Sequence, residues 1–173
     1  GFGALFHAVN HSLTKGMLFF VAGNILAAYK TKFTADVSGV IRMLPVSGVL
    51  WVAGFLAITG SPPFGAFLSE LIILKSALDQ GRPIVAAAYL FLLSVVFIGM
   101  ATSVLKMYQG MPAVPAERAE SPEAGGGPIG PSTESFLAIA PPMALGFAVL
   151  VLGLYFPPLL RTMIEHAARA IAG

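Results

Sequence analysis

Four long runs of apolar residues restrict this chain to very few folds. The runs cover residues 3–29, 46–78, 83–107 and 135–160. Each reaches the ~20 residues that an α-helix needs to cross the hydrocarbon core of a bilayer. Hydrophobic residues make up 57% and charged residues 10% of the 173 residues, whereas soluble domains carry about 25% charged residues. A soluble core cannot bury this much apolar surface, so we expect an integral membrane protein.

The runs are long and continuous, which favours helices over the short alternating segments of a membrane β-barrel. We therefore predict an all-α polytopic bundle of about four transmembrane helices. The second helix differs from the others because Gly60-Ser61-Pro62-Pro63 interrupts its apolar run. Proline lacks an N–H group and clashes with the preceding turn, so we expect this helix to be broken there. Discontinuous helices recur around the ion sites of transporters.

The connections divide the chain into three parts. We expect three transmembrane helices within residues 1–109, a flexible extramembrane loop at 110–133, and a last helix with an amphipathic tail at 134–173. The loop is rich in Pro, Gly, Ala and Glu, a composition that cannot form a core. Residues 30–44 are expected to form a short polar loop. The chain opens with Gly inside an apolar run, so we expect it to be the C-terminal part of a longer membrane protein.

Three ionisable side chains share one face of the first predicted helix. His7, His11 and Lys15 are spaced four residues apart, which makes a ladder about 12 Å long at ~1.5 Å per residue. Lys15 would lie near the middle of the bilayer, where a charged lysine costs about 2.5–3.5 kcal/mol. A cost of that size indicates a functional group that faces a partner or a wet cavity. Histidine titrates near neutral pH, so His7 and His11 can pass protons along this face.

A second ionisable group follows the expected helix break. Glu70 lies about two turns beyond it, and an intramembrane carboxyl group is a functional candidate by default. Lys75 lies nearer the helix end, where its side chain can join such a site or simply extend to the interface. The break can also be a kink that accommodates a neighbouring helix. Lys15 and Glu70 together point to proton handling more strongly than either residue alone.

Other kinds of site find little support in the sequence. The chain has no cysteine and three histidines, of which only His166 lies outside the first helix. We therefore expect no haem and no metal ion. The basic residues are scattered, so nucleic acid is not expected as a partner.

Two segments resemble a known family. Residues 7–19 are similar to the motif H-x-x-x-H-x-x-x-K-x-x-L-F of antiporter-like membrane subunits, and residues 60–70 resemble the pattern G-h-P-P-h-x-G-F-x-S-[KE], where h is apolar. Ser61 and Ala66 depart from that pattern without removing the break or the acid. The family includes proton-pumping subunits of respiratory complex I, Mrp-type Na+/H+ antiporters and membrane-bound hydrogenases. With Glu70 where others have Lys, the chain looks most like the hydrogenase-4 or formate hydrogenlyase type; the resemblance is strongest over residues 2–80.

The resemblance implies roles for these residues. Lys15 matches the lysine that connects two half-channels, Glu70 matches the charged residue on the broken helix, and His11 and His7 match the histidines of the central relay. The implied protein is a proton-translocating subunit of the bacterial cytoplasmic membrane. Its partners would be lipid and the other membrane subunits of a complex I-like or hydrogenase complex, and it would move protons, or Na+ as well. It would hold no redox cofactor and would not be catalytic alone.

Two alternatives stay open at this point. A stand-alone cation/proton antiporter would use the same residues without a redox partner. In a purely structural membrane module these ionisable residues would have no role in transport, so Lys15→Ala and Glu70→Gln would not change coupling.

Overall fold

The computed structural model describes residues 2–111 and 134–172, and within these ranges the regular elements are all helices. In chain order they are α1 (Phe2–Tyr29), the 3-10 helix η1 (Thr34–Asp36), α2 (Val40–Met43), α3 (Pro45–Ile58), α4 (Gly65–Asp79), α5 (Pro83–Tyr108), α7 (Phe136–Leu154) and α8 (Pro158–Ala172). Residues 112–133, most of the predicted extramembrane loop, lie outside the described residues.

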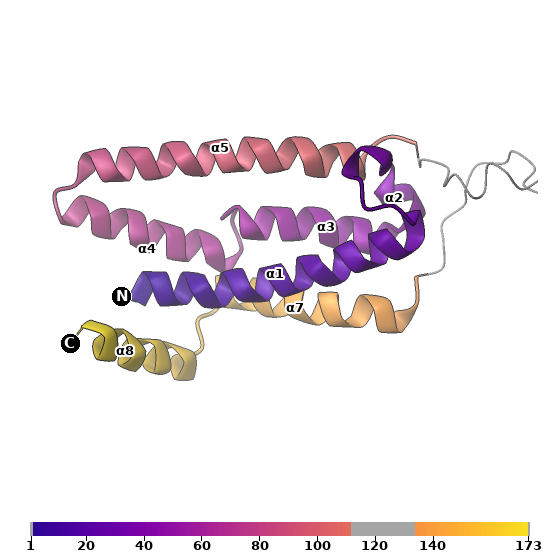
Figure 1. The fold of residues 1–173 in the computed structure, drawn as a ribbon. Coiled ribbons are helices and arrows are strands. Elements are labelled where there is room, and N and C mark those ends of the chain that lie inside the picture. Colours follow the sequence, from indigo (N-terminus) through magenta and orange to yellow (C-terminus); the bar gives the residue numbers. More distant parts are fainter. Residues whose placement is uncertain (1, 112–133, 173) are drawn as a thin grey trace, which may run out of the picture.

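Three of these helices, α1, α5 and α7, are long and apolar enough to cross a membrane. A fourth crossing is divided: α3 has 14 residues and α4 has 15, and each is shorter than the ~20 residues of a full span. The two follow one another along the bundle with a turn between them (Figure 1). The predicted all-α membrane bundle with a broken second helix is thereby confirmed.

Helix α1 lies at the centre and packs against α3, α4 and α7. Its buried residues recur every three or four positions and so form one stripe along the helix. They are Gly3, Phe6, Asn10, Thr14, Met17, Val21, Ile25 and Tyr29. Helix α5 runs along α3 and α4 (Figure 1), and most of its residues are exposed. An exposed apolar face suits contact with lipid, which is as apolar as leucine.

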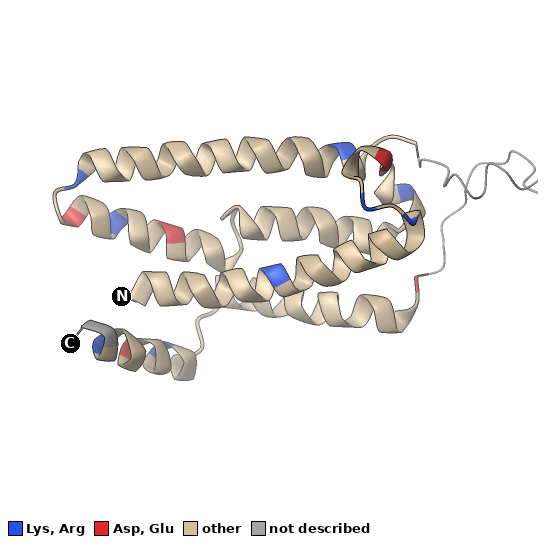
Figure 2. Ribbon diagram, in the orientation of Figure 1, with Lys and Arg blue, Asp and Glu red and all other residues tan. Residues whose placement is uncertain are grey.

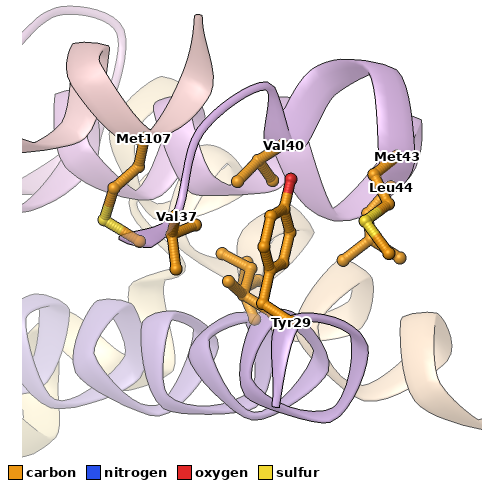
Figure 3. Packing of buried hydrophobic residues seen from close by; sticks show 8 residues of the cluster. Tyr29, Val37, Val40, Met43, Leu44 and Met107 are labelled. Carbon is orange, nitrogen blue, oxygen red and sulfur yellow. The ribbon is translucent and has the colours of Figure 1, made fainter. Parts of the chain in front are cut away.

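The segment between α1 and α3 is more ordered than the predicted polar loop. It contains η1 and α2, and it contributes Val37, Val40, Met43 and Leu44 to a buried apolar cluster with Tyr29 (Figure 3). The Tyr29 hydroxyl donates to the Ser38 carbonyl at 2.7 Å, which ties this segment to the end of α1. The apolar residues among the charged ones explain the difference, because they bury surface that a solvated loop would expose.

Helix α7 carries Pro141 and Pro142 inside it and still continues. Pro142 has no N–H for the carbonyl four residues earlier, that of Ala138. The Asn24 side chain of α1 donates to this carbonyl at 3.0 Å. A side chain from the neighbouring helix therefore replaces the bond that proline removes.

The last helix ends earlier than the sequence pattern predicts. The expected span of 135–160 stops at Leu154, and Tyr155 is already extended. Pro157 accounts for this, because in a continued helix its ring would clash with the carbonyl four residues earlier and because Phe156 before it is disfavoured in the helical region. Helix α8 then begins at Pro158 and contacts α1. Its exposed face carries an Arg161–Glu165 ion pair at 2.8 Å.

Candidate functional site

The break between α3 and α4 lies against the middle of the bundle. Helix α3 ends at Ile58, and the Thr59 hydroxyl donates back to the Phe55 carbonyl at 2.8 Å. Gly60 has φ +67°, a left-handed conformation that L side chains rarely adopt. The Phe64 amide donates to the Ser61 carbonyl at 3.2 Å before α4 begins at Gly65. The turn thus satisfies part of its own backbone and leaves α4 to start without a side-chain cap.

Glu70 is the acid that this break positions. It is 9% exposed, and its carboxylate lies so close to Gly60 that a Cβ at position 60 would overlap it. Glycine is therefore required at position 60 both for its φ and for the approach of this side chain. Among the described residues, nothing forms a hydrogen bond or ion pair with the Glu70 carboxylate. An unpartnered carboxylate in apolar surroundings is costly, so the group favours the protonated form or a mobile counter-charge.

The open side of Glu70 faces a cleft between α4 and α5. The cleft has a volume of about 430 Å³ and is lined mainly by apolar side chains, with Glu70, Tyr89 and Ser94 among its polar residues. Tyr89 comes from the inward side of α5, a helix that is otherwise mostly exposed. The cleft therefore borders Glu70 on the side of α5.

The histidines of α1 approach α4 from the other side. His7 Nδ1 lies 3.0 Å from the Ser69 hydroxyl oxygen, and Ser69 directly precedes Glu70. The His7 and His11 rings stack with centroids 5.6 Å apart and an interplanar angle of 25°. The structure therefore brings His7 and His11 together, and it brings His7 to the helix that carries Glu70.

The two lysines lie elsewhere. Lys15 is exposed on α1 and is the only Lys, Arg, Asp or Glu of that helix; most other charges gather nearer the ends of the bundle (Figure 2). In the part of the chain that the structure describes, Lys15 forms no ion pair. Lys75 pairs with Asp79 at 2.6 Å, and both side chains are exposed. Neither lysine contacts Glu70 through a hydrogen bond or ion pair within the described residues.

Asn10 lies on the buried stripe of α1, beside the start of α4. Its Nδ2 donates to the Phe6 carbonyl at 3.0 Å, while its buried Oδ1 finds no hydrogen-bond partner among the described residues. That oxygen lies against Gly65, where a Cβ would overlap it. Thr14 is also buried, and its hydroxyl donates to the Asn10 carbonyl at 2.8 Å. Asn10 and Thr14 thus place two buried polar side chains on α1, each within three residues of His11 in the sequence.

Sequence reasoning missed a second polar cluster, at the opposite end of the bundle. The Glu134 carboxylate accepts hydrogen bonds from the Val46 amide at 2.7 Å, the Ser47 amide at 3.0 Å and the Ser47 hydroxyl. Asn24 Nδ2 in turn donates to the Ser47 hydroxyl oxygen at 3.1 Å. Glu134 therefore caps the N-terminus of α3 from 87 to 88 residues away in sequence. A separation of that size leaves no local signal in the sequence.

Residues that could hold a metal ion are not gathered anywhere in the described ranges: no group of three or more His, Cys, Asp or Glu is found there. The chemistry that this arrangement supports is proton exchange. A buried carboxyl group, without a hydrogen-bond or ion-pair partner among the described residues, lies beside a broken helix, with stacked imidazoles on one side and a cleft on the other.

The comparisons with known proteins agree with this architecture. Residues 2–98 match the NADH:quinone oxidoreductase/Mrp antiporter transmembrane family. The chain belongs to this family, as the two motifs predicted.

Individual relatives come from several of its branches. The chain is 32% identical to a hydrogenase-4 component F homologue of Methylacidiphilum infernorum, over 96% of this chain and 32% of the relative. It is 28% identical to the NADH-quinone oxidoreductase subunit N of Desulforudis audaxviator, over 96% of this chain and 33% of the relative. It therefore spans about a third of the length of these curated relatives. The alignments reach well beyond residue 80, where the recognisable motifs end.

A solved structure shows the same fold. The Mrp complex from Dietzia sp. DQ12-45-1b contains a chain that matches with a TM-score of 0.73 and 25% sequence identity. The match covers 96% of this chain and 37% of that chain. The overall arrangement of the helices is thus shared with a chain of that Mrp complex.

Proposed function

We propose that this chain translocates protons across the membrane as part of a redox-driven complex related to NADH:quinone oxidoreductase or to membrane-bound hydrogenase. The observation that carries the proposal is Glu70, which is buried, unpartnered among the described residues and held against the Gly60 turn. A carboxyl group in that position binds a proton readily and releases it when the surrounding charge changes.

The relay in this proposal runs from Lys15 through His11 and His7 to Glu70. Lys15 is exposed on α1, where a further membrane helix or subunit can contact it. Redox work elsewhere in the complex would shift charge near Lys15 and so alter the proton affinity of the groups beyond it. Glu70 would then pass its proton into the cleft along α5. Lys75 has no part in this relay, because it is exposed and paired with Asp79.

Relatives named hydrogenase-4 component F and NADH-quinone oxidoreductase subunit N support partners of the same kind. We infer that the chain works with other membrane subunits of such a complex, in the bacterial cytoplasmic membrane. In this proposal the redox cofactors belong to those partners, and the chain contributes the proton path. The three parts of the chain would be the helices of residues 1–109, a loop outside the membrane at 110–133, and the last helix and tail at 134–173.

A cation/proton antiporter is the second candidate. It is favoured by the Na(+)/H(+) antiporter subunit A1 of Staphylococcus epidermidis, which is 28% identical over 98% of this chain and 21% of the relative, and by the fold shared with the Mrp complex. In that function the same carboxyl group would bind a proton or Na+ in turn, driven by an ion gradient rather than by electron transfer.

Proton uptake by inverted membrane vesicles that carry the complete parent complex tests the proposal. Glu70→Gln should lower proton uptake per electron well below that of the wild type, because the amide cannot exchange a proton. Glu165→Gln is the matched control, because Glu165 lies on α8 and forms an ion pair with Arg161. This variant should leave proton uptake per electron unchanged. Unchanged pumping per electron in Glu70→Gln would contradict the proposal. Na+-driven proton movement without redox turnover would favour the antiporter.

A further inference from the structure

We propose that Ser69 holds His7 in the tautomer that carries its proton on Nδ1, so that His7 exchanges protons through Nε2 alone. The inference deepens the proposed function. The part that this tautomer would play in a proton relay rests on that function. Its structural content, the position of one proton, can be measured independently.

The directions of two hydrogen bonds carry the inference. The Ser69 hydroxyl lies 2.7 Å from the Ala66 carbonyl oxygen and 3.0 Å from His7 Nδ1. A carbonyl oxygen can only accept, and a serine hydroxyl has one proton to donate. That proton goes to Ala66, so the Ser69 oxygen accepts the second bond and His7 Nδ1 must be the donor. Ser69 is fully buried, which leaves no solvent to exchange these roles.

The hydrogen bonds from His7 end at a group that cannot pass a proton on. They run from His7 Nδ1–H to the Ser69 hydroxyl and from there to the Ala66 carbonyl. A backbone carbonyl is an acceptor without a proton of its own to pass on. Although Ser69 precedes Glu70 in the sequence, it therefore does not conduct protons from His7 to Glu70. It orients the imidazole ring instead.

Proton exchange is thereby directed to the other ring nitrogen. Nε2 of a histidine with Nδ1–H is the free acceptor when the ring is neutral. The ring stacks on His11, one turn along α1, with centroids 5.6 Å apart. His7 therefore takes up and releases its proton at Nε2, and a transfer to Glu70 requires water rather than the Ser69 hydroxyl. Ser69 is a positioning residue in this arrangement.

The test is solid-state NMR of the complete protein in lipid bilayers, with 15N-labelled histidine, at a pH where imidazole is neutral. The His7 signals are identified by their loss in His7→Gln. We expect the one-bond N–H coupling at Nδ1 and none at Nε2. Protonation at Nε2 in the wild type would overturn the inference without the need for any Ser69 variant.

A pair of serine variants adds a second check. Ser69→Ala removes the acceptor, and we expect the His7 proton to leave Nδ1 for Nε2 in a substantial fraction of molecules. Ser76→Ala, on the exposed side of the same helix, should leave the tautomer as it is. An unchanged tautomer in Ser69→Ala would overturn the role of Ser69. Failure of the proposed function shows separately, as unchanged pumping in Glu70→Gln while His7 keeps its proton on Nδ1.

Discussion

Two glutamates in this bundle have opposite surroundings. Glu134 accepts three hydrogen bonds at the N-terminus of α3, from two backbone amides and the Ser47 hydroxyl. Glu70 lies buried beside the break that ends the same helix, with no hydrogen bond or ion pair to any described residue. One end of α3 thus holds a carboxylate fixed by three donors, and the other end faces an acid to which no described residue donates.

The difference shows what each carboxyl group can do. The two backbone amides and the Ser47 hydroxyl that point at Glu134 hold its carboxylate in place at the N-terminus of α3. Among the described residues, no donor holds the Glu70 carboxyl group in this way, which is what the proposed exchange of its proton requires.

The largest loss of stability is expected from Glu134→Ala. The variant leaves the Val46 and Ser47 amides and the Ser47 hydroxyl without their acceptor, and we expect it to cost about 3 kcal/mol. Glu70→Gln should cost much less, because it removes no hydrogen bond. Thermal unfolding in detergent micelles compares the two variants. Equal losses would mean that the two carboxyl groups do not differ as described.

A second test concerns the glycine that admits Glu70. Gly60 and Gly81 share φ +67°, but only at Gly60 would a Cβ meet the Glu70 carboxylate; at Gly81 it would meet open space. Each alanine variant costs about 1–2 kcal/mol for the left-handed backbone. Gly60→Ala should cost more than Gly81→Ala and should also lower proton uptake. The same loss of stability in both variants would show that Glu70 has room to move away.

Asn24 links the Glu134 cluster to α7. Asn24→Ala loses the bonds to Ser47 and to the Ala138 carbonyl, and we expect a loss of about 1 kcal/mol. Pro142→Ala restores an N–H for that carbonyl, so the cost of Asn24→Ala should shrink in the Pro142→Ala background. A double-mutant cycle of unfolding free energies measures this coupling. Strict additivity would argue against the exchange of one bond for the other.

Glu165 extends the comparison to a carboxyl group in solvent. The hydrogen bond from Arg161 holds the pKa of Glu165 below its ordinary value. Since the pKa is lower in the folded state, the stabilisation is present above the unfolded-state pKa and is lost as the pH falls through the folded-state pKa. A carboxyl 13C titration should place the pKa of Glu165 below that of an unpaired glutamate, and Arg161→Gln should return it. The effect on helix stability should be the smallest of the four.

The sequence predicts the parts of this fold that depend on local chemistry. The apolar runs indicate the spans, and Gly60-Ser61-Pro62-Pro63 indicates the break, because each signal lies within one segment. Pro141 and Pro142 show the limit of such signals, since their helix continues with help from Asn24, which lies 114 residues away from Ala138. The loop expected at 30–44 instead packs α2 into the core.

The candidate site likewise has features that local sequence signals predict and features that only the folded chain reveals. Spacing alone places His7, His11 and Lys15 on one face of α1, and the motif singles out Glu70. The contact of His7 with Ser69 spans 62 residues, so only the folded chain reveals it. The exposure of Lys15 and the Lys75–Asp79 pair also follow from packing, which no periodicity records.

The close approach of the last turn of α7 to the turn between α3 and α4 limits which residue can occupy position 153. Gly153 lies against the Pro63 carbonyl, so closely that any Cβ there would overlap it. The glycine thus allows α7 to lie directly on the backbone of the turn between α3 and α4. A Gly153→Ala variant would have to move either α7 or the turn that precedes Glu70.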